Sequence, residues 1–134
     1  MERMTDTDAA NDALELADRF FSAVEDGDID ALRAIYAPDA VVWHNHDQLE
    51  QPVEENLVTL RWIARNLPQR AYTDIQRDAV PGGFVQQHVL RARTKWGVDL
   101  VLPAMMRVWC ENGRITRLDE YFDSAQLAVL DRRD

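Results

Sequence analysis

The hydrophobic period of the chain changes once, near Arg70, and this change constrains the fold more than any other feature of the sequence. Before it, apolar residues recur at the spacing of amphipathic helices, most clearly in a segment that ends at Gly27. The apolar positions of that segment are Leu14, Ala17, Phe20, Phe21 and Val24. After Arg70 the period is two, as in strands, over residues 70–80, 84–94, 99–111 and 114–122. Helices followed by a strand meander predict an α+β fold, with helices on one face of a mainly antiparallel sheet.

Capping and breaking residues divide the first half of the chain further. Asp28 is a suitable N-cap for a second helix, which runs through Ile29, Leu32, Ile35 and Tyr36 until Pro38 ends it. Residues 40–46 are rich in Val and Trp and predict the first strand. Pro52 then opens a third helix, which Pro68 closes.

Turn signals separate the later strands. Pro81-Gly82-Gly83 and Asn112-Gly113 interrupt the alternating pattern, and Asn-Gly is a strong hairpin signal. The sequence contains no repeat, low-complexity tract or internal linker. We therefore expect a single domain over residues 1–134, with flexible ends at residues 1–7 and about 128–134.

Composition and charge exclude several classes of protein. The 134 residues are 46% hydrophobic and 29% charged, which is typical of a folded soluble domain. A formal net charge of −9 disfavours nucleic acid and anionic membrane surfaces as partners. Cys110 is the single cysteine, so the chain forms no internal disulfide and no thiol cluster for zinc. The sequence shows neither an export signal nor a membrane-spanning apolar stretch, and it predicts a cytoplasmic protein.

Strand alternation predicts where the polar side chains of the last strand point. One face holds Ile115, Arg117, Asp119 and Tyr121. The other face holds Thr116, Leu118, Glu120 and Phe122. Arg117 and Asp119 favour water, so we expect Glu120 to point toward the helices.

The same reasoning applies to two further strands. In residues 84–94, Arg91 and Arg93 mark the outer face. The inner face is then Phe84, Gln86, His88, Leu90 and Ala92. In residues 40–46, one side of the strand holds His44 and the other holds Trp43. The pattern alone does not decide which of these sides points inward.

Several motifs, together with the element order, resemble one known superfamily. They are Asp18-Arg19-Phe20-Phe21 with Gly27-Asp28 and Asp30, Ile35-Tyr36-Ala37-Pro38-Asp39-Ala40-Val41, and Asn112-Gly113-Arg114-Ile115 followed by Glu120-Tyr121-Phe122-Asp123. Over nearly the whole chain they resemble the nuclear transport factor 2-like (NTF2-like, cystatin-like α+β cone) superfamily, in particular its SnoaL-like and ketosteroid isomerase-like branches. The resemblance implies three N-terminal helices on a strongly curved sheet. It also implies an enclosed apolar pocket for a small hydrophobic or aromatic molecule, a homodimer formed through the sheet, and no cofactor.

The resemblance also assigns candidate catalytic residues. His44 matches the general-base aspartate of ketosteroid isomerases and a water-holding asparagine of limonene epoxide hydrolase-like proteins. Glu120 matches a carboxylate of those hydrolases. A glutamate can orient a histidine and stabilise its protonated form, so the two make a base-competent pair, with His88 as a polarising donor. The expected substrate-binding residues are Phe20, Tyr36, Val42, His46, Trp62, Gln86, Leu102, Met106, Leu118 and Phe122.

The sequence departs from two activities of this superfamily. The isomerase oxyanion hole needs a tyrosine and a protonated acid, but the matching residues are Phe20 and Met105 or Met106, which donate no hydrogen bond. True steroid isomerase activity is therefore not expected. The epoxide hydrolase triad needs an arginine and an aspartate within residues 84–94, and Arg91 would turn inward only through a one-residue bulge.

Two alternatives concern metal and catalysis. The three histidines and Glu120 offer ligands that suit zinc or iron. No second ligand cluster is evident and the superfamily is mostly metal-free, so we expect no metal. The leading hypothesis is acid/base catalysis of the polyketide cyclase, isomerase or hydratase/hydrolase type. The alternative is a non-catalytic ligand-binding or protein-association module.

Overall fold

The chain folds into helices packed on one curved sheet, as a computed structural model describes for residues 5–133. The helices are α1 (Asp6–Asp26), α2 (Ile29–Ile35) and α3 (Val53–Asn66). The strands are β1 (Tyr36–His44), β2 (Glu50–Pro52), β3 (Gln69–Val80), β4 (Gly83–Arg93), β5 (Asp99–Glu111) and β6 (Arg114–Phe122). A 3-10 helix, η1 (Ser124–Asp131), follows the last strand.

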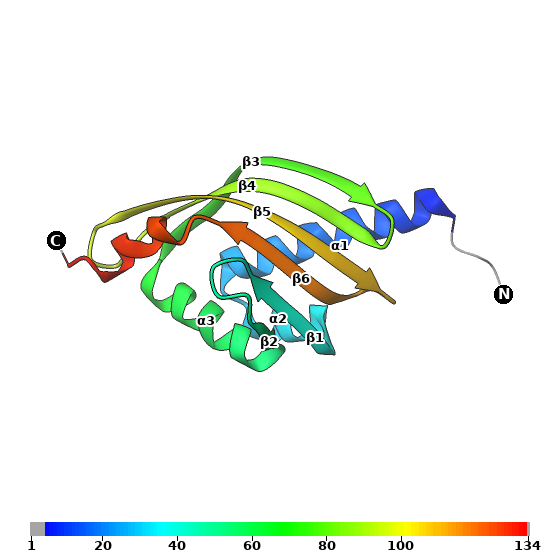
Figure 1. Cartoon of the computed structure of the whole chain (residues 1–134), viewed down its shortest axis with the longest axis horizontal. Coiled ribbons are helices and arrows are strands. Elements are labelled where there is room, and N and C mark those ends of the chain that lie inside the picture. Colours follow the sequence, from blue (N-terminus) through cyan, green and yellow to red (C-terminus); the bar gives the residue numbers. More distant parts are fainter. Residues whose placement is uncertain (1–4, 134) are drawn as a thin grey trace.

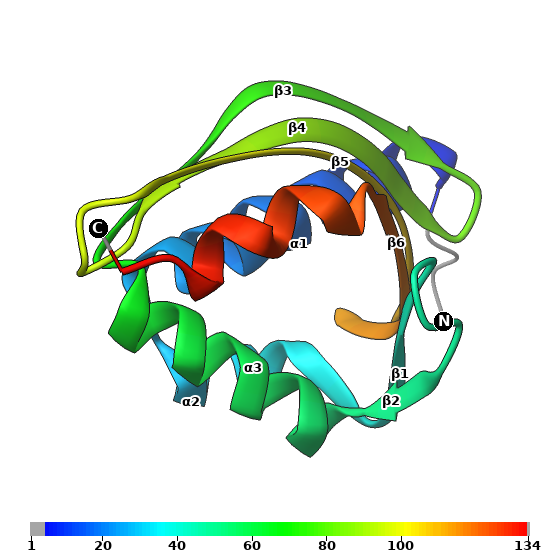
Figure 2. The same cartoon turned by 60° about the vertical axis from the view of Figure 1, so that its left-hand side comes forward.

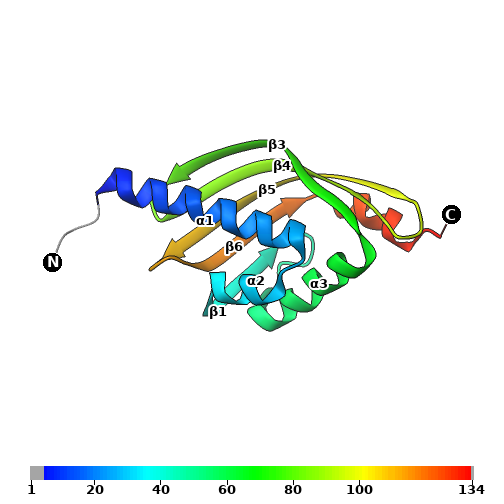
Figure 3. The same ribbon diagram turned by 180° about the vertical axis from the view of Figure 1, so that it is seen from behind.

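The six strands form one sheet in the order β2-β1-β6-β5-β4-β3 (Figure 1). Among the described residues, β1 and β6 pair in parallel and the other neighbouring strands pair antiparallel. The sheet curls so that α1 and α3 lie on its concave side (Figure 2). Seen from behind, α1 crosses the strands along this inner face (Figure 3). The predicted α+β fold, with helices on one face of a mainly antiparallel sheet, is confirmed.

The helix ends follow from capping residues. The Thr5 side chain accepts a hydrogen bond from the Asp8 backbone nitrogen at 3.0 Å at the start of α1. Gly27 ends that helix in the left-handed conformation, with φ of 70°. Asp28 caps α2 by accepting from the Ala31 nitrogen at 3.1 Å, so this N-cap prediction is confirmed.

The main core lies between α1 and the concave face of the sheet. Phe20 and Phe21 of α1 are each 4% exposed, and their rings meet edge to face. Phe21 also contacts the ring of Phe84 on β4, which is fully buried. Burial of one such aromatic side chain stabilises the fold by about 1.5–3 kcal/mol. A second, smaller cluster lies beneath η1 and consists of Leu67, Ala92, Leu100 and Leu102.

Some boundaries differ from the sequence-based expectations. Helix α1 begins at Asp6, inside the lead-in expected over residues 1–7, of which residues 1–4 lie outside the described part. Tyr36 opens β1 instead of ending the second helix: its backbone is already extended, and Pro38 disfavours helical geometry in the next residue, Ala37. The strand accordingly covers Tyr36–His44, whereas the prediction was 40–46.

Two elements were not predicted at all. Strand β2 has three residues, which is too short to show an alternating pattern. Helix η1 reaches into the end that we expected to be flexible from about residue 128. It is held there because Leu127, Val129 and Leu130 pack against the second core cluster. Residue 134 lies outside the described part.

A bulge corrects the predicted direction of Ile115. The β5–β6 register shifts between Trp109 and Cys110, so Arg117 pairs with Trp109 while Ile115 pairs with Cys110. The extra residue on β6 reverses the alternation at this point. Ile115 is therefore fully buried, instead of sharing the outer face with Arg117.

Within residues 5–133, no helix has both the length and the apolar character needed to cross a membrane.

Candidate functional site

A row of cross-strand neighbours on the concave face carries four polar side chains. Arg77 of β3 pairs with Gln86 of β4, and Gln86 pairs with Met106 of β5. Met106 pairs with Glu120 of β6, which in turn pairs with His44 of β1. Directly opposed residues in a sheet project to the same face. The fold thus aligns these five side chains across five strands.

The pair at one end of this row is His44 and Glu120. The His44 Nε2 atom lies 3.2 Å from the Glu120 Oε1 atom, at ion-pair distance. Their side chains are 16% and 19% exposed, so both are largely withdrawn from water. The ring of Phe122 packs edge-on against the His44 ring, with centroids 5.8 Å apart. An imidazole and a carboxylate in this arrangement can exchange a proton and stabilise one another's charge.

Asn45 fixes the end of β1 beside this pair. Its side-chain nitrogen donates to the Phe122 carbonyl at 3.1 Å, and its side-chain oxygen accepts from the Phe122 nitrogen at 3.0 Å. The Asn45 backbone nitrogen donates to the Glu120 carbonyl at 3.1 Å. These three bonds anchor the residue next to His44 to the strand that carries Glu120. Sequence reasoning did not identify this role.

His88 belongs to the adjacent row, in which it pairs with Ala104 and Ala104 pairs with Phe122. Its side chain is almost fully buried, with the rings of Tyr72 and Phe21 edge-on at 4.7 Å and 5.5 Å. Burial holds the pKa of His88 below its usual value; the nearby Glu120 opposes this effect and Arg77 adds to it. His88 is therefore an uncharged imidazole at neutral pH.

Two phenols, the buried Tyr36 and the partly buried Tyr72, lie within the field of the Glu120 carboxylate. Burial raises the pKa of Tyr36 and of Tyr72, and the charge of Glu120 raises both further. The Tyr36 hydroxyl donates to the Asn56 side-chain oxygen at 3.0 Å. Both phenols are thus protonated at neutral pH, and Glu120 faces the same interior as His88.

One protein-family model covers most of the chain. The SnoaL-like domain model matches residues 17–118. The chain belongs to the SnoaL-like family. It carries the NTF2-like fold, which solved structures share. Comparison with curated proteins finds no match.

Solved structures with this SnoaL-like fold have low sequence identity to the chain. A protein from Xanthomonas campestris, assigned provisionally as a polyketide cyclase, aligns with a TM-score of 0.77 and 20% identity over 88% of this chain and 95% of its own. An LEH-like epoxide hydrolase from M. tuberculosis aligns with a TM-score of 0.70 and 17% identity, over 87% and 86%. An NTF2-like protein from Burkholderia xenovorans aligns with a TM-score of 0.72 and 15% identity, over 98% and 100%. At these identities the similarity establishes the fold and leaves the activity open.

The SnoaL-like site does not gather all the side chains expected to bind substrate. Gln86 is fully buried in the row described above, and His46 is an exposed neighbour of His44 and Phe122. The residues that pack in the main core are Phe20, Tyr36, Val42, Met106 and Leu118. Leu102 instead belongs to the second core cluster, and Trp62 is 39% exposed on α3. The binding roles of these residues stay predictions.

Arg91 does not enter the site. The β4–β5 register runs without interruption from Gly83 to Arg93, so β4 contains no bulge that could turn Arg91 inward. Its guanidinium instead bonds the Thr73 hydroxyl at 3.0 Å and lies 3.4 Å from Asp74 on the exposed side. The SnoaL-like domain thus lacks the inward arginine that the epoxide hydrolase triad requires at this strand.

Sequence reasoning missed Arg77, Tyr72 and Asn56. On a regular strand Tyr72 and Arg77 would face opposite sides, because they are an odd number of residues apart. The β3–β4 register shifts between Thr73 and Gln76, and Asp74 there adopts φ of 54°. This bulge brings Arg77 to the inner face. Asn56 gave no signal, because a single polar residue in a helix is most often exposed.

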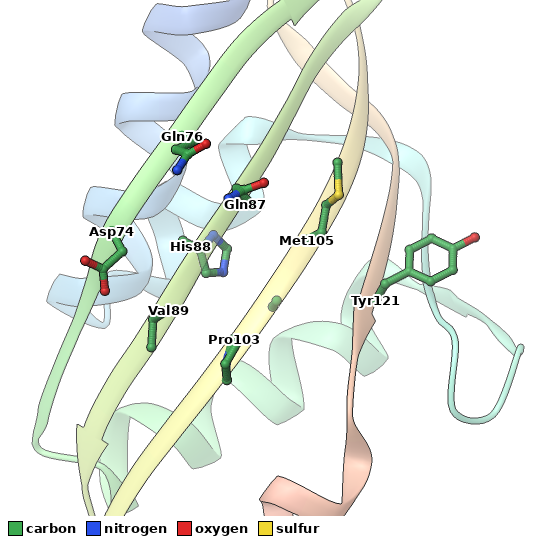
Figure 4. Close-up of a pocket in the computed structure, with 9 residues that line it drawn as sticks. Asp74, Gln76, Gln87, His88, Val89, Pro103, Met105 and Tyr121 are labelled. Atoms are coloured by element: carbon green, nitrogen blue, oxygen red, sulfur yellow. The ribbon is translucent and has the colours of Figure 1, made fainter.

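Two surface hollows lie away from the His44–Glu120 pair. The first, of about 390 Å³, is on the outer face of the sheet over the β3 bulge, between Asp74, Gln87, Met105 and Tyr121 (Figure 4). The second, of about 840 Å³, lies between the first turns of α1 and the two hairpins at Pro81-Gly82 and Asn112-Gly113. Among residues 5–133, no three His, Cys, Asp or Glu side chains gather as a metal site would require. The absence of a metal requirement remains a prediction.

Proposed function

We propose that this SnoaL-like protein is a cofactor-independent acid/base enzyme acting on a small hydrophobic or aromatic molecule. The observation that carries the proposal is the 3.2 Å contact between His44 Nε2 and Glu120 Oε1 on the concave face. One of the two groups accepts a proton from the substrate, and the other stabilises the charge that results. General acid/base catalysis of this kind contributes about 10²–10⁴-fold to a rate.

The neighbouring side chains favour proton abstraction beside a carbonyl group. His88 is uncharged and can donate a hydrogen bond to the oxygen on which negative charge develops. Cyclase and isomerase reactions need such a transfer from carbon, and a hydratase or hydrolase reaction would use the same pair to take a proton from water. The polyketide cyclase and epoxide hydrolase assignments of the structural relatives are consistent with this class.

Apolar side chains around the pair favour a hydrophobic substrate. Leu118 and Phe122 flank Glu120 on the inner face of β6, and Met106 opposes it on β5. An apolar ring placed against these side chains would bury hydrophobic area on both partners, which stabilises binding by about 25 cal/mol per Å².

Deuterium exchange tests the proposal without knowledge of the natural substrate. An aryl β-keto ester is incubated in deuterated buffer, and the loss of its acidic C–H signal is followed by NMR. The protein should accelerate exchange over buffer alone. His44→Gln and Glu120→Gln should each lower that acceleration by about 100-fold, while Glu111→Gln, on the exposed end of β5, should leave it unchanged.

Binding of the same ester, measured by calorimetry, separates catalysis from recognition. If the unaltered protein binds the ester but exchanges no faster than buffer, the chain is a ligand-binding module and the catalytic proposal is wrong. Equal exchange by Glu120→Gln and Glu111→Gln would also contradict it. Mass spectrometry of the natively purified protein would identify a small molecule that co-purifies.

We also propose, from the family resemblance, that the protein is a homodimer formed through the outer face of its sheet. Apolar side chains exposed by between 45% and 53% occupy strands of that sheet, namely Ile75, Val101, Met105 and Tyr121. Exposed apolar area of this kind is typical of interaction surfaces. The cytoplasmic location remains a prediction from the sequence.

A further inference from the structure

A chain of hydrogen bonds connects the surface of α1 to the ring of His88. An Arg77 Nη1 atom lies 2.6 Å from the Asp18 carboxylate, and the Arg77 Nε donates to the Gln86 Oε1 at 2.6 Å. The Gln86 Nε2 atom then lies 2.8 Å from the His88 Nδ1 atom. Gln86 is fully buried and His88 is 4% exposed, so the inner contact of the chain is shielded from water, while Asp18 at its outer end is exposed. The chain spans α1, β3 and β4.

The direction of each bond follows from the chemistry of its donor. A guanidinium has only N–H donors, so the Gln86 atom that faces Arg77 must be the carbonyl oxygen. The amide nitrogen of Gln86 then faces His88, and an amide nitrogen can only donate. The His88 Nδ1 atom must accept and cannot carry a proton. In a neutral imidazole, the proton therefore sits on Nε2.

We infer that Arg77 and Gln86 are positioning residues that hold His88 in the neutral Nε2–H tautomer, so that its ring presents a hydrogen-bond donor to a carbonyl oxygen of the substrate. This inference rests on the proposed function, in which His88 polarises the substrate. To that proposal we add the residues that set the protonation state of His88. We also add a chemical class for the ligand, namely carbonyl compounds.

The surroundings of His88 oppose the other two forms of the ring. A doubly protonated ring would place an Nδ1–H against the N–H of Gln86. The charged groups near the ring are Arg77 from β3, which disfavours a second positive charge, and Glu120 from β6, which favours it. Tyr72 from β3 and Phe21 from α1 present uncharged rings edge-on. The Nδ1–H tautomer would leave the same donor-to-donor contact with Gln86.

The Nε2 atom keeps its hydrogen-bonding capacity for a ligand. It takes part in no hydrogen bond with a described residue, and it is not among the fully enclosed polar atoms that lack a partner. Ala104 is the cross-strand neighbour of His88, and its small side chain separates the imidazole from Phe122 on the next strand. The His88 side chain lies one row from Glu120 on the concave face, so a carbonyl compound that accepts from Nε2–H would be within the reach of both residues that the proposed proton transfer requires.

NMR of the resting protein with ¹⁵N-labelled histidine tests the inference directly. The nitrogen shifts and two-bond couplings to the ring protons distinguish a protonated from an unprotonated ring nitrogen. At neutral pH, we expect His88 to show an unprotonated Nδ1 and a protonated Nε2. A proton on Nδ1 of the unaltered protein would overturn the inference, whether or not any variant folds.

The variant Gln86→Glu supplies the sharpest change. A carboxylate only accepts, so Nδ1 of His88 should become protonated and the pattern of the unaltered protein should be lost. Gln87→Glu is the matched control, because it adds the same charge at the next residue, on the exposed face of β4. It should leave the His88 pattern unchanged, and an unchanged pattern in Gln86→Glu as well would contradict the inference.

Arg77→Met tests the outer link while keeping an apolar stem over Phe21, where the Arg77 guanidinium now lies 5.5 Å from the ring centroid. Without Arg77, the Gln86 amide is free to rotate, and His88 should show a mixture of both tautomers. A single Nε2–H tautomer in this variant would show that Arg77 has no positioning role. Because no substrate is present, these results are independent of the exchange assay, and the inference and the proposed function can fail separately.

Discussion

At the residue scale, His88 should make the stability of the fold depend on pH. Its pKa is held below its usual value, chiefly by burial. In the unfolded chain its pKa returns to about 6.5. Between these two values the unfolded chain binds the proton more readily, so acid favours unfolding. The contribution of His88 is complete above pH of about 6.5 and is lost as the pH falls through the lowered folded pKa.

We therefore predict that His88→Gln flattens the acid side of the stability profile. The free energy of unfolding, measured with urea between mildly acidic and neutral pH, should fall less steeply toward acid than in the unaltered protein. His46→Gln, in which an exposed histidine is removed, is the control and should keep the original slope. Equal slopes for His88→Gln and the unaltered protein would show that His88 titrates alike in both states.

The site residues differ in how far the sequence could predict them. Alternation within single strands placed Gln86 and His88 on the inner face, and both are buried. The resemblance was needed for His44, because the apolar residues of β1 occur on both sides of the strand. Arg77 could not be found by either route, since a bulge between Thr73 and Gln76 changes its direction and depends on pairing with β4. Single-strand patterns carry no information about such pairing.

At the element scale, the start of β4 depends on a close approach of its backbone to the backbone of β5. A Cβ added at Gly83 would lie 1.8 Å from the Val108 carbonyl oxygen on β5. Backbone atoms cannot move aside as the end of a long side chain can. Only glycine therefore allows β4 to begin at this distance from β5.

We predict that Gly83→Ala lowers the free energy of unfolding by about 3 kcal/mol or more, because the strands must separate to admit the methyl group. Gly113→Ala is the matched control: its Cβ meets no atom within 4 Å, but its φ is 75°. It should cost only about 1 kcal/mol, the strain of the left-handed conformation. Urea unfolding of both variants measures the difference, and equal losses would rule out the clash as the cause.

The elements were predicted better than their irregularities. The four long strands appear within a residue of their expected bounds, because each shows alternation between clear turn signals. The shift at Trp109 and Cys110 was invisible, and it reversed the direction of Ile115. Curvature requires such bulges somewhere in a strongly bent sheet, but their positions depend on cross-strand contacts that no local pattern encodes.

At the scale of the whole molecule, the outer sheet face should decide the oligomeric state. Met105 and Tyr121 are about half exposed there, and Tyr121 packs against Trp43 with ring centroids 5.3 Å apart. If two copies meet through this face, a charge at its centre must be buried without a partner, which is costly. We predict that the unaltered protein is a dimer and that Met105→Glu is a monomer.

Light scattering coupled to gel filtration measures this directly. Val58→Glu is the control, because Val58 is 62% exposed on α3, away from the sheet. It adds the same charge and should leave the dimer intact. A monomeric unaltered protein, or a dimer that persists in Met105→Glu, would contradict the proposed interface.

The parallel pairing of β1 with β6 also determines when the site can form during folding. The contacts that join the two strands include the Asn45–Phe122 bonds, between residues 77 positions apart. The antiparallel hairpins of β3, β4 and β5 need only short loops to close, whereas this pairing closes nearly the entire chain on itself. On a ribosome, the partner of His44 emerges only after almost all of the sheet. The proposed proton-transfer chemistry is thus withheld from the nascent chain until its last strand has joined the first.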